Sequence, residues 1–130
     1  MTYYFSKTIS GKSFDEVIER VTEELKKQGF GVVTEIDMKE TLKKKIDVDF
    51  RKYKILGACH PQFAHKILMT DDKIGVFLPC NVVVQELESG SIEVFAVDPV
   101  ASMMAVKNDS LMDIATEVQQ KLKNVVGNIN

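Results

Sequence analysis

Two short apolar runs, each carrying a cysteine beside or near a proline, most constrain how this chain folds. The first spans residues 55–61, Ile-Leu-Gly-Ala-Cys-His-Pro, and the second spans residues 74–81, Ile-Gly-Val-Phe-Leu-Pro-Cys-Asn. Short apolar runs bounded by proline and turn residues are typical of buried strands. If the two strand ends lie side by side, Cys59 and Cys80 form one small polar spot in an apolar wall.

Strand and helix patterns alternate along the first half of the sequence. Residues 2–9 are rich in β-formers and predict a strand, and Ser13 with Glu16 forms a capping box that opens an amphipathic helix ending near Gly29. Residues 31–36 predict a second strand, and Asp37 is a candidate cap for a short helix. We also expect a strand at residues 53–59 and a helix that begins at Pro61.

The second half predicts a hairpin and two helices. Residues 74–87 form an apolar run that we interpret as a strand with a bulge or an edge position near Pro79, because proline cannot donate to a β-ladder. A turn at residues 88–91 leads to a partner strand at residues 92–97. Asp98-Pro99 is expected to start a short helix, and a final helix is expected from Asp109 or Ser110.

This order of elements predicts an α+β fold. Residues 1–130 are expected to form a single two-layer domain, because no linker or repeat interrupts the series. We predict a twisted, largely antiparallel sheet with the helices packed mainly on one face. A doubly wound parallel sheet is disfavoured, since no glycine-rich phosphate loop follows the first strand.

Composition excludes several classes of function. The 130 residues are 45% hydrophobic and 28% charged, as in ordinary globular proteins, and the net charge of −2 offers no field for nucleic acid. No apolar run approaches the roughly 20 residues of a membrane span, and no signal peptide is evident. With two cysteines, we expect a cytoplasmic protein with reduced thiols. We expect no membrane partner and no nucleic acid.

The two cysteines each have a chemical and a structural interpretation. Cys59 is expected just before a helix N-terminus, where partial positive charge lowers a thiol pKa, so it is a candidate nucleophile, redox centre or ligand. The more common role of such a residue is that of a small apolar side chain that fills a core. Cys80 precedes Asn81, whose amide is able to orient a ligand or to satisfy backbone groups near Pro79.

Other polar residues extend this set of candidates. His60 and Asp98 are candidate ligand-binding groups; Asp98 is a possible general base, although Asp-Pro is first of all a helix cap. Two cysteines with His60 and His65 do not have the spacing of a zinc site, so no metal and no cofactor is expected. The lysines at residues 43–45 predict a solvated face. Met103 with Met104 predicts core or dimer contacts, with a flexible lining of a ligand pocket as the weaker alternative.

The two cysteine motifs resemble a known family. Residues 56–61 and 78–84, followed by Asp98-Pro99, are similar to the bacterial and archaeal family catalogued as domain of unknown function 302, over essentially the whole chain. The resemblance implies a TATA-box-binding-protein-like α+β fold and a homodimer, and it implies no activity. One departure is that His60 stands where asparagine is common in the family, which would make ligand binding here pH-sensitive.

Three functions compete on this basis. The first is a non-catalytic module that binds a small molecule at a polar site around Cys59, Cys80 and Asn81. The second is a thiol-dependent enzyme or redox protein that uses Cys59. The third is a structural or interaction protein that acts through a dimer face. Serine hydrolase, P-loop and dinucleotide signatures are absent from the sequence, and the ligand-binding module is our leading hypothesis.

Overall fold

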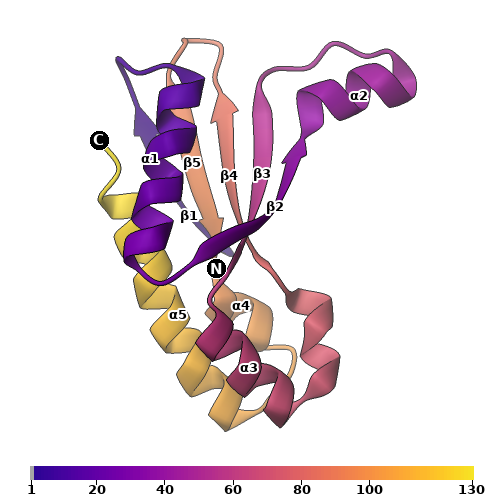
Figure 1. Ribbon diagram of the computed structural model, residues 1–130, viewed down its shortest axis with the longest axis vertical. Helices are drawn as coiled ribbons and strands as arrows, with labels where there is room; N and C mark the ends of the chain where they lie inside the picture. The colour runs from indigo at the N-terminus through magenta and orange to yellow at the C-terminus, as the bar shows by residue number, and fades with distance from the viewer. Residues whose placement is uncertain (1) are drawn as a thin grey trace.

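A computed structural model describes residues 2–130 and contains one antiparallel sheet with its main helices on one side (Figure 1). The elements follow in the order β1 (Tyr4–Ile9), α1 (Phe14–Lys27), β2 (Gly31–Asp37), α2 (Met38–Ile46), β3 (Tyr53–Cys59), α3 (Pro61–Thr70), the 3-10 helix η1 (Asp72–Phe77), β4 (Cys80–Glu86), β5 (Ile92–Val97), α4 (Pro99–Met103) and α5 (Asp109–Gly127). Among residues 2–130, no helix is both long and apolar enough to cross a membrane.

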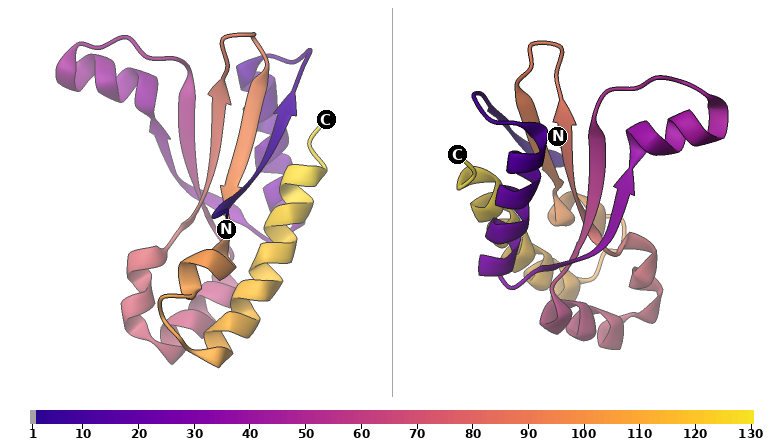
Figure 2. Two further views of the ribbon diagram at one scale, coloured as in Figure 1. Left: turned by 180° about the vertical axis from the view of Figure 1, so that it is seen from behind. Right: turned by 45° about the horizontal axis from the view of Figure 1, so that its top comes forward.

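The five strands run in the order β1-β5-β4-β3-β2, and every neighbouring pair is antiparallel. Helices α1 and α5 lie against one face, whereas the view from behind shows the opposite face without a helix across it (Figure 2). The prediction of an α+β fold with a largely antiparallel sheet and helices mainly on one face is therefore confirmed.

Helix α1 forms where the sequence predicts it, with both ends fixed by hydrogen bonds. Ser13 Oγ accepts from the Glu16 amide at 3.1 Å, and the Glu16 carboxylate accepts from the Ser13 amide, which completes the capping box. At the other end, the Phe30 amide donates to Leu25 O across Gly29, which has φ +89°. This is a Schellman ending, and its positive φ favours glycine.

Helix α2 begins at its predicted cap but stands apart from the core. Asp37 Oδ1 accepts from the Glu40 amide at 3.0 Å, yet no residue of the helix is buried, and Figure 1 shows the helix projecting beyond the sheet. Its lysines form exposed ion pairs, such as Lys43 with Asp47 at 2.9 Å. The predicted solvated basic face is thus present on α2.

The second cysteine run departs from its prediction. We expected a strand from residue 74, but Asp72–Phe77 is the 3-10 helix η1, capped by Asp71, which accepts from the Lys73 amide at 2.9 Å. Strand β4 begins only at Cys80, directly after the cis Leu78-Pro79 bond. Because Pro79 has no N–H for the ladder, pairing starts one residue later. The expected bulge near Pro79 is absent from the described pairing, and the irregularity lies in β2 between Val32 and Thr34.

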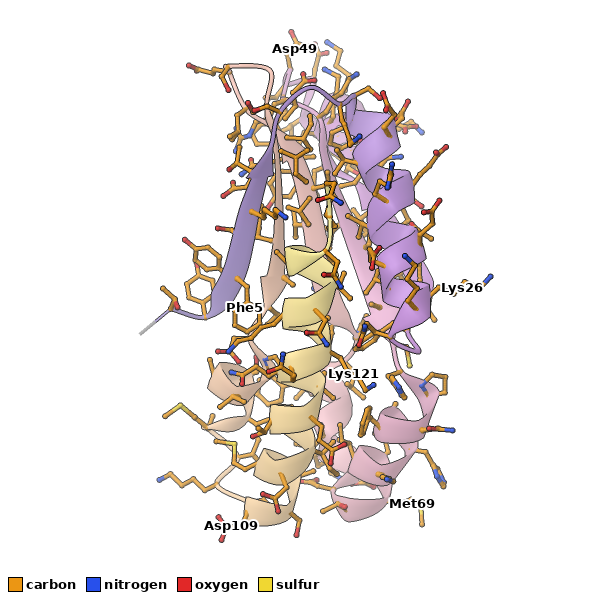
Figure 3. The ribbon with its side chains drawn as sticks, turned by 90° about the vertical axis from the view of Figure 1, so that its left-hand side faces the viewer. Phe5, Lys26, Asp49, Met69, Asp109 and Lys121 are labelled. Atoms are coloured by element: carbon orange, nitrogen blue, oxygen red, sulfur yellow. The ribbon has the colours of Figure 1, made fainter. Side chains whose placement is uncertain are left out.

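Two separate hydrophobic clusters support the fold. The main core lies between the sheet, α1 and the second half of α5, and includes Val17, Val84 and Leu122. A second core lies among α3, η1, α4 and the first half of α5, and consists of Ile67, Ile74, Met103, Leu111 and Ala115. Figure 3 shows α5 running past both regions, from Asp109 beside the end of α3 to beyond Lys121. Helix α5 therefore belongs to both cores.

Candidate functional site

A cavity of about 150 Å³ lies where the two cores meet. Its walls contain residues of the main core, such as Phe30 and Val118, and residues of the second core, such as Ile67 and Met103. The lining consists mostly of apolar side chains, and its residues are Phe30, Ala58, Cys59, His60, Phe63, Ala64, Ile67, Phe77, Leu78, Pro79, Cys80, Asn81, Val97, Pro99, Ser102, Met103, Leu111, Ala115 and Val118. The few polar groups converge from the two cysteine motifs and from α4.

Two prolines help to determine where this cavity forms. Pro61 is the first residue of α3, where its missing N–H costs no helical hydrogen bond, so β3 ends and a helix begins beside the sheet. Pro79 precedes β4 and delays strand pairing until Cys80. The chain thus leaves the sheet at the end of β3 and re-enters it at the start of β4, at the same end of the two neighbouring strands (Figure 1). Between these points, α3 and η1 carry apolar side chains beyond the strand ends.

The ends of β3 and β4 lie side by side, as the sequence predicts. Ala58 pairs with Cys80 in the antiparallel register, which leaves Cys59 one residue beyond that pair. Both cysteines are free and both contribute to the cavity lining. Burial, with a smaller contribution from the neighbouring Cys59, raises the pKa of the Cys80 thiol to about 11. Cys80 is therefore a neutral thiol near pH 7, and it packs against the main core.

His60 is an aromatic part of the cavity wall. Its ring lies 5.3 Å from the Phe30 ring and 4.4 Å from the Phe63 ring, measured between centroids. Although His60 is the N-cap residue of α3, its side chain makes no capping hydrogen bond, and its buried Nδ1 has no hydrogen-bond partner within residues 2–130. Burial lowers the pKa of His60, and the positive charge of Lys121 lowers it further, so the ring is neutral near pH 7.

The remaining predicted residues occupy different positions. Asn81 is exposed and belongs to the cavity lining, opposite Gly57 on β3. Asp98 is not part of the lining. Its Oδ1 accepts from the Val100 amide at 2.9 Å and from Gln119 Nε2 at 3.0 Å, so it caps α4 and joins it to α5. The structure thus brings Cys59, His60, Cys80 and Asn81 to one cavity and leaves Asp98 outside it.

Several residues that the sequence predicts mainly as core line the cavity. The sequence places Phe63 and Ile67 on the buried stripe of the helix after Pro61. It predicts core or dimer contacts for Met103, with a ligand-pocket lining as the weaker alternative. The structure places all three on the cavity wall. Ala115 was expected on the buried face of the final helix, whereas Ser102 was not singled out. No motif in the sequence marks Ser102 as a lining residue.

A metal site does not form around these groups. Among residues 2–130, no three His, Cys, Asp or Glu side chains gather closely enough to hold a metal ion. His65 lies exposed on α3 and does not belong to the cavity lining, so it does not complete a set with the two cysteines and His60. The cavity is a largely apolar space with single polar atoms on its walls.

Comparisons with known proteins give one family and a matching structure. The sequence model of the family described as "Domain of unknown function DUF302" matches residues 5–129. The crystal structure of an uncharacterized conserved DUF302 protein from Bacillus stearothermophilus is 28% identical in sequence and superposes with a TM-score of 0.91, covering 100% of both chains. No match is found among curated proteins.

Proposed function

This chain belongs to the DUF302 family, and from that premise we propose that it is a non-catalytic module that binds a small, largely apolar molecule. The observation that carries the proposal is the cavity of about 150 Å³ at the junction of the two cores. Small-molecule sites are typically concave and apolar, with a few polar groups that orient the ligand. Cys59, His60, Cys80, Asn81 and Ser102 are the polar members of this lining.

The size of the cavity limits the class of ligand. An apolar cavity of this volume holds a molecule of about the size of benzene. Phe63, Ile67 and Met103 offer aromatic, branched and flexible surfaces to such a molecule. No lysine or arginine belongs to the lining, so a charged group of the ligand would lose its hydration without a direct countercharge. We therefore expect a neutral ligand.

A thiol-dependent reaction has less support. The raised pKa of Cys80 keeps its sulfur protonated near neutral pH, and a protonated thiol is a poor nucleophile. Any covalent chemistry would then depend on Cys59, with His60 as the nearest candidate base in the sequence. A neutral Cys80 thiol is instead suited to contact an apolar ligand from the wall of the cavity.

Titration with benzene tests the binding proposal. We would record methyl NMR spectra of the native protein and follow Ile67 and Met103 beside the cavity, with Val17 in the main core as an internal reference. Binding predicts saturable shifts at the cavity methyls and a rise in Tm, because the ligand binds only the native state. Absence of saturable shifts at every cavity methyl would overturn the proposal.

A filled cavity provides the matching control. Ala115→Leu places a larger side chain into the space from α5, and we expect the benzene response to disappear while the protein stays folded. Ala96→Leu is the counterpart at a buried alanine of β5 that does not line the cavity. There, overpacking is expected to cost about 1–3 kcal/mol of stability and to leave benzene binding in place. Retained binding in Ala115→Leu would place the benzene elsewhere.

We further propose that a second copy of the chain covers the open face of the sheet. Direct register pairs align Ile36, Ile55, Val83 and Phe95 across four strands on one face. Since Val82 and Val84 belong to the main core beneath the helices, this row is on the opposite face. Tyr4 and Tyr53 add edge-on aromatic contacts to Phe95, at 6.2 and 6.3 Å.

A second copy fits this face better than a charged partner. The row is uncharged, so it is complementary to itself in a two-fold dimer. Five strands about 4.8 Å apart and roughly six residues long offer a face of about 20 by 24 Å, on the scale of a small dimer interface. Sedimentation equilibrium tests this: Phe95→Lys is expected to yield monomers, whereas Val76→Lys, at an exposed apolar residue of η1, is expected to leave the dimer intact. A monomeric unmodified protein at micromolar concentration would overturn the proposal.

A further inference from the structure

A chain of three polar side chains crosses the open face of the sheet beside its apolar row. Arg51 Nε donates to Gln85 Oε1 at 2.8 Å, and Gln85 Nε2 donates to Glu93 Oε1 at 2.7 Å. Gln85 and Glu93 are register partners, and they lie two residues along their strands from Val83 and Phe95. Residues two positions apart on a strand share a face, so the polar chain lies on the same face as the apolar row.

The charges at the two ends of this chain are not paired within residues 2–130. No ion pair in that part of the protein includes Arg51 or Glu93. Arg51 is exposed, and its guanidinium carbon lies 4.3 Å from the centroid of the Phe50 ring, which holds the cation near the face. Glu93 is half-buried, and the neutral amide of Gln85 gives its charge no partner. One cation and one anion therefore remain available on the same face.

The central strand β4 separates the two charges. In the order β1-β5-β4-β3-β2, strand β4 is the middle one. Arg51 comes just before β3, and Glu93 lies on β5. A rotation by 180° about an axis that lies in the interface and follows β4 places β3 of one copy over β5 of the other. Contacts across such an axis are reciprocal, so each of them occurs twice.

We propose that Arg51 of each copy forms an ion pair with the partner's Glu93 in a dimer whose two-fold axis follows β4. This inference rests on the proposed dimer through the open face and adds its orientation and the contact that specifies it. Sheets that pack face to face lie about 10 Å apart, a distance that an arginine and a glutamate side chain span from opposite sides. A uniformly acidic or basic partner would be repelled by one of the two charges, whereas a second copy neutralises both.

Charge reversal tests the pairing. In sedimentation equilibrium, Arg51→Glu and Glu93→Arg are each expected to weaken the dimer by at least about 10-fold, because each change opposes like charges at both pairs. An equimolar mixture of the two variants is expected to recover the dimer, since both pairs of the heterodimer again join opposite charges. Unchanged affinity in Arg51→Glu, or no recovery in the mixture, would overturn the inference.

Lys52→Glu is the matched control, at the exposed neighbour of Arg51 and with the same net charge as Arg51→Glu. We expect this variant to dimerise normally and to give no recovery when it is mixed with Glu93→Arg. Recovery in that mixture would mean that net charge alone drives association, and it would overturn the specific pairing.

An NMR experiment on the unmodified protein tests the axis independently of the variants. The same rotation places Ile55 of β3 opposite the partner's Phe95. In a mixture of ¹³C-labelled and unlabelled chains, isotope-filtered NOEs are therefore expected between the Ile55 methyl groups and the partner's Phe95 ring. A dimer without these NOEs would overturn the orientation and leave the open-face proposal to the Phe95→Lys test. A monomeric unmodified protein would overturn both.

Discussion

Gly29 and His60 lie in direct contact across the turn between α1 and β2: a Cβ on Gly29 would stand 2.6 Å from Nε2 of His60. Gly29→Ala would therefore displace the imidazole and also strain a backbone at φ +89°. Gly90 has φ +88° with no atom within 4 Å of its added Cβ, so Gly90→Ala measures the backbone strain alone, about 1–2 kcal/mol. We expect urea denaturation to show a larger loss for Gly29→Ala. Equal losses would show that the ring moves at no cost.

Gly57 of β3 lies against Thr34 of β2 and against Pro79 in the segment before β4. An added Cβ would overlap Thr34 Oγ1 and stand 2.7 Å from Pro79 Cγ. We expect Gly57→Ala to lower the free energy of unfolding by about 1–3 kcal/mol, as overpacking does in cores. Gly31→Ala on β2, with open space at its Cβ, is the matched control and is expected to change stability little. A neutral Gly57→Ala would mean that Thr34 rotates freely aside.

The Cys80 thiol is expected to be unreactive at neutral pH. Since burial raises its pKa to about 11, its alkylation rate in the native protein should rise mainly above pH 9, whereas a free thiol with a pKa of about 8.5 is already mostly ionised at pH 9. Mass spectrometry of the Cys59→Ser variant isolates Cys80, and urea-unfolded protein supplies the reference rate. Rapid native alkylation of Cys80 at pH 7.5 would contradict the structure and restore thiol chemistry at this residue.

Asp98 is expected to act as a cap and not as a base. Asp98→Ala removes the acceptor for Val100 and Gln119, and we expect it to destabilise the protein by about 1–2 kcal/mol. Asp98→Asn keeps the side-chain oxygen and removes the charge, so it should retain most of that stability. Thermal denaturation of both variants tests the cap, because equal losses would show that stability depends on the carboxylate charge and not on the side-chain oxygen.

His60 should make the protein less stable in mild acid. Its folded pKa is lower than its ordinary value of 6.5, so the unfolded chain takes up the proton first as pH falls. The free energy of unfolding therefore declines as pH drops below about 7, until the pH passes the folded pKa, where the loss is complete. We expect a shallower slope in His60→Phe than in His65→Gln, which changes an exposed histidine. Identical slopes would exclude His60 as the cause.

Much of the fold follows from local patterns in the sequence. The Ser13-Glu16 capping box, the Asp37 cap and the proline that opens α3 each specify an element boundary through contacts within a few residues. The hairpin of β4 and β5 likewise needed only its turn residues and alternation. Local hydrogen bonds determine these features, and local sequence is therefore sufficient to predict them.

Residues 74–79 and the cavity could not be predicted in the same way. An apolar run of this length suits a buried strand or a short helix equally well, and only the packing of Ile74 into the second core selects the helix η1. The cavity arises because two cores meet incompletely, which depends on side chains distant in sequence, such as Phe30 and Met103. The sequence predicted four of the polar groups that gather at this site, but it also predicted Asp98, which lies outside the lining, and it missed Ser102.

The pairing of β1 with β5 has a consequence for how the chain folds. Tyr4 of β1 pairs with Val97 of β5, so the two ends of a loop that contains most of the chain must meet before this edge of the sheet can form. Strands β3, β4 and β5 pair with nearby neighbours and need much shorter loops. Because closing a long loop has a higher entropy cost, local pairing is expected to come first and β1 to join late. Folding of this domain should therefore be slower than that of a helical bundle of equal length, with β1 the last strand to gain protection from hydrogen exchange.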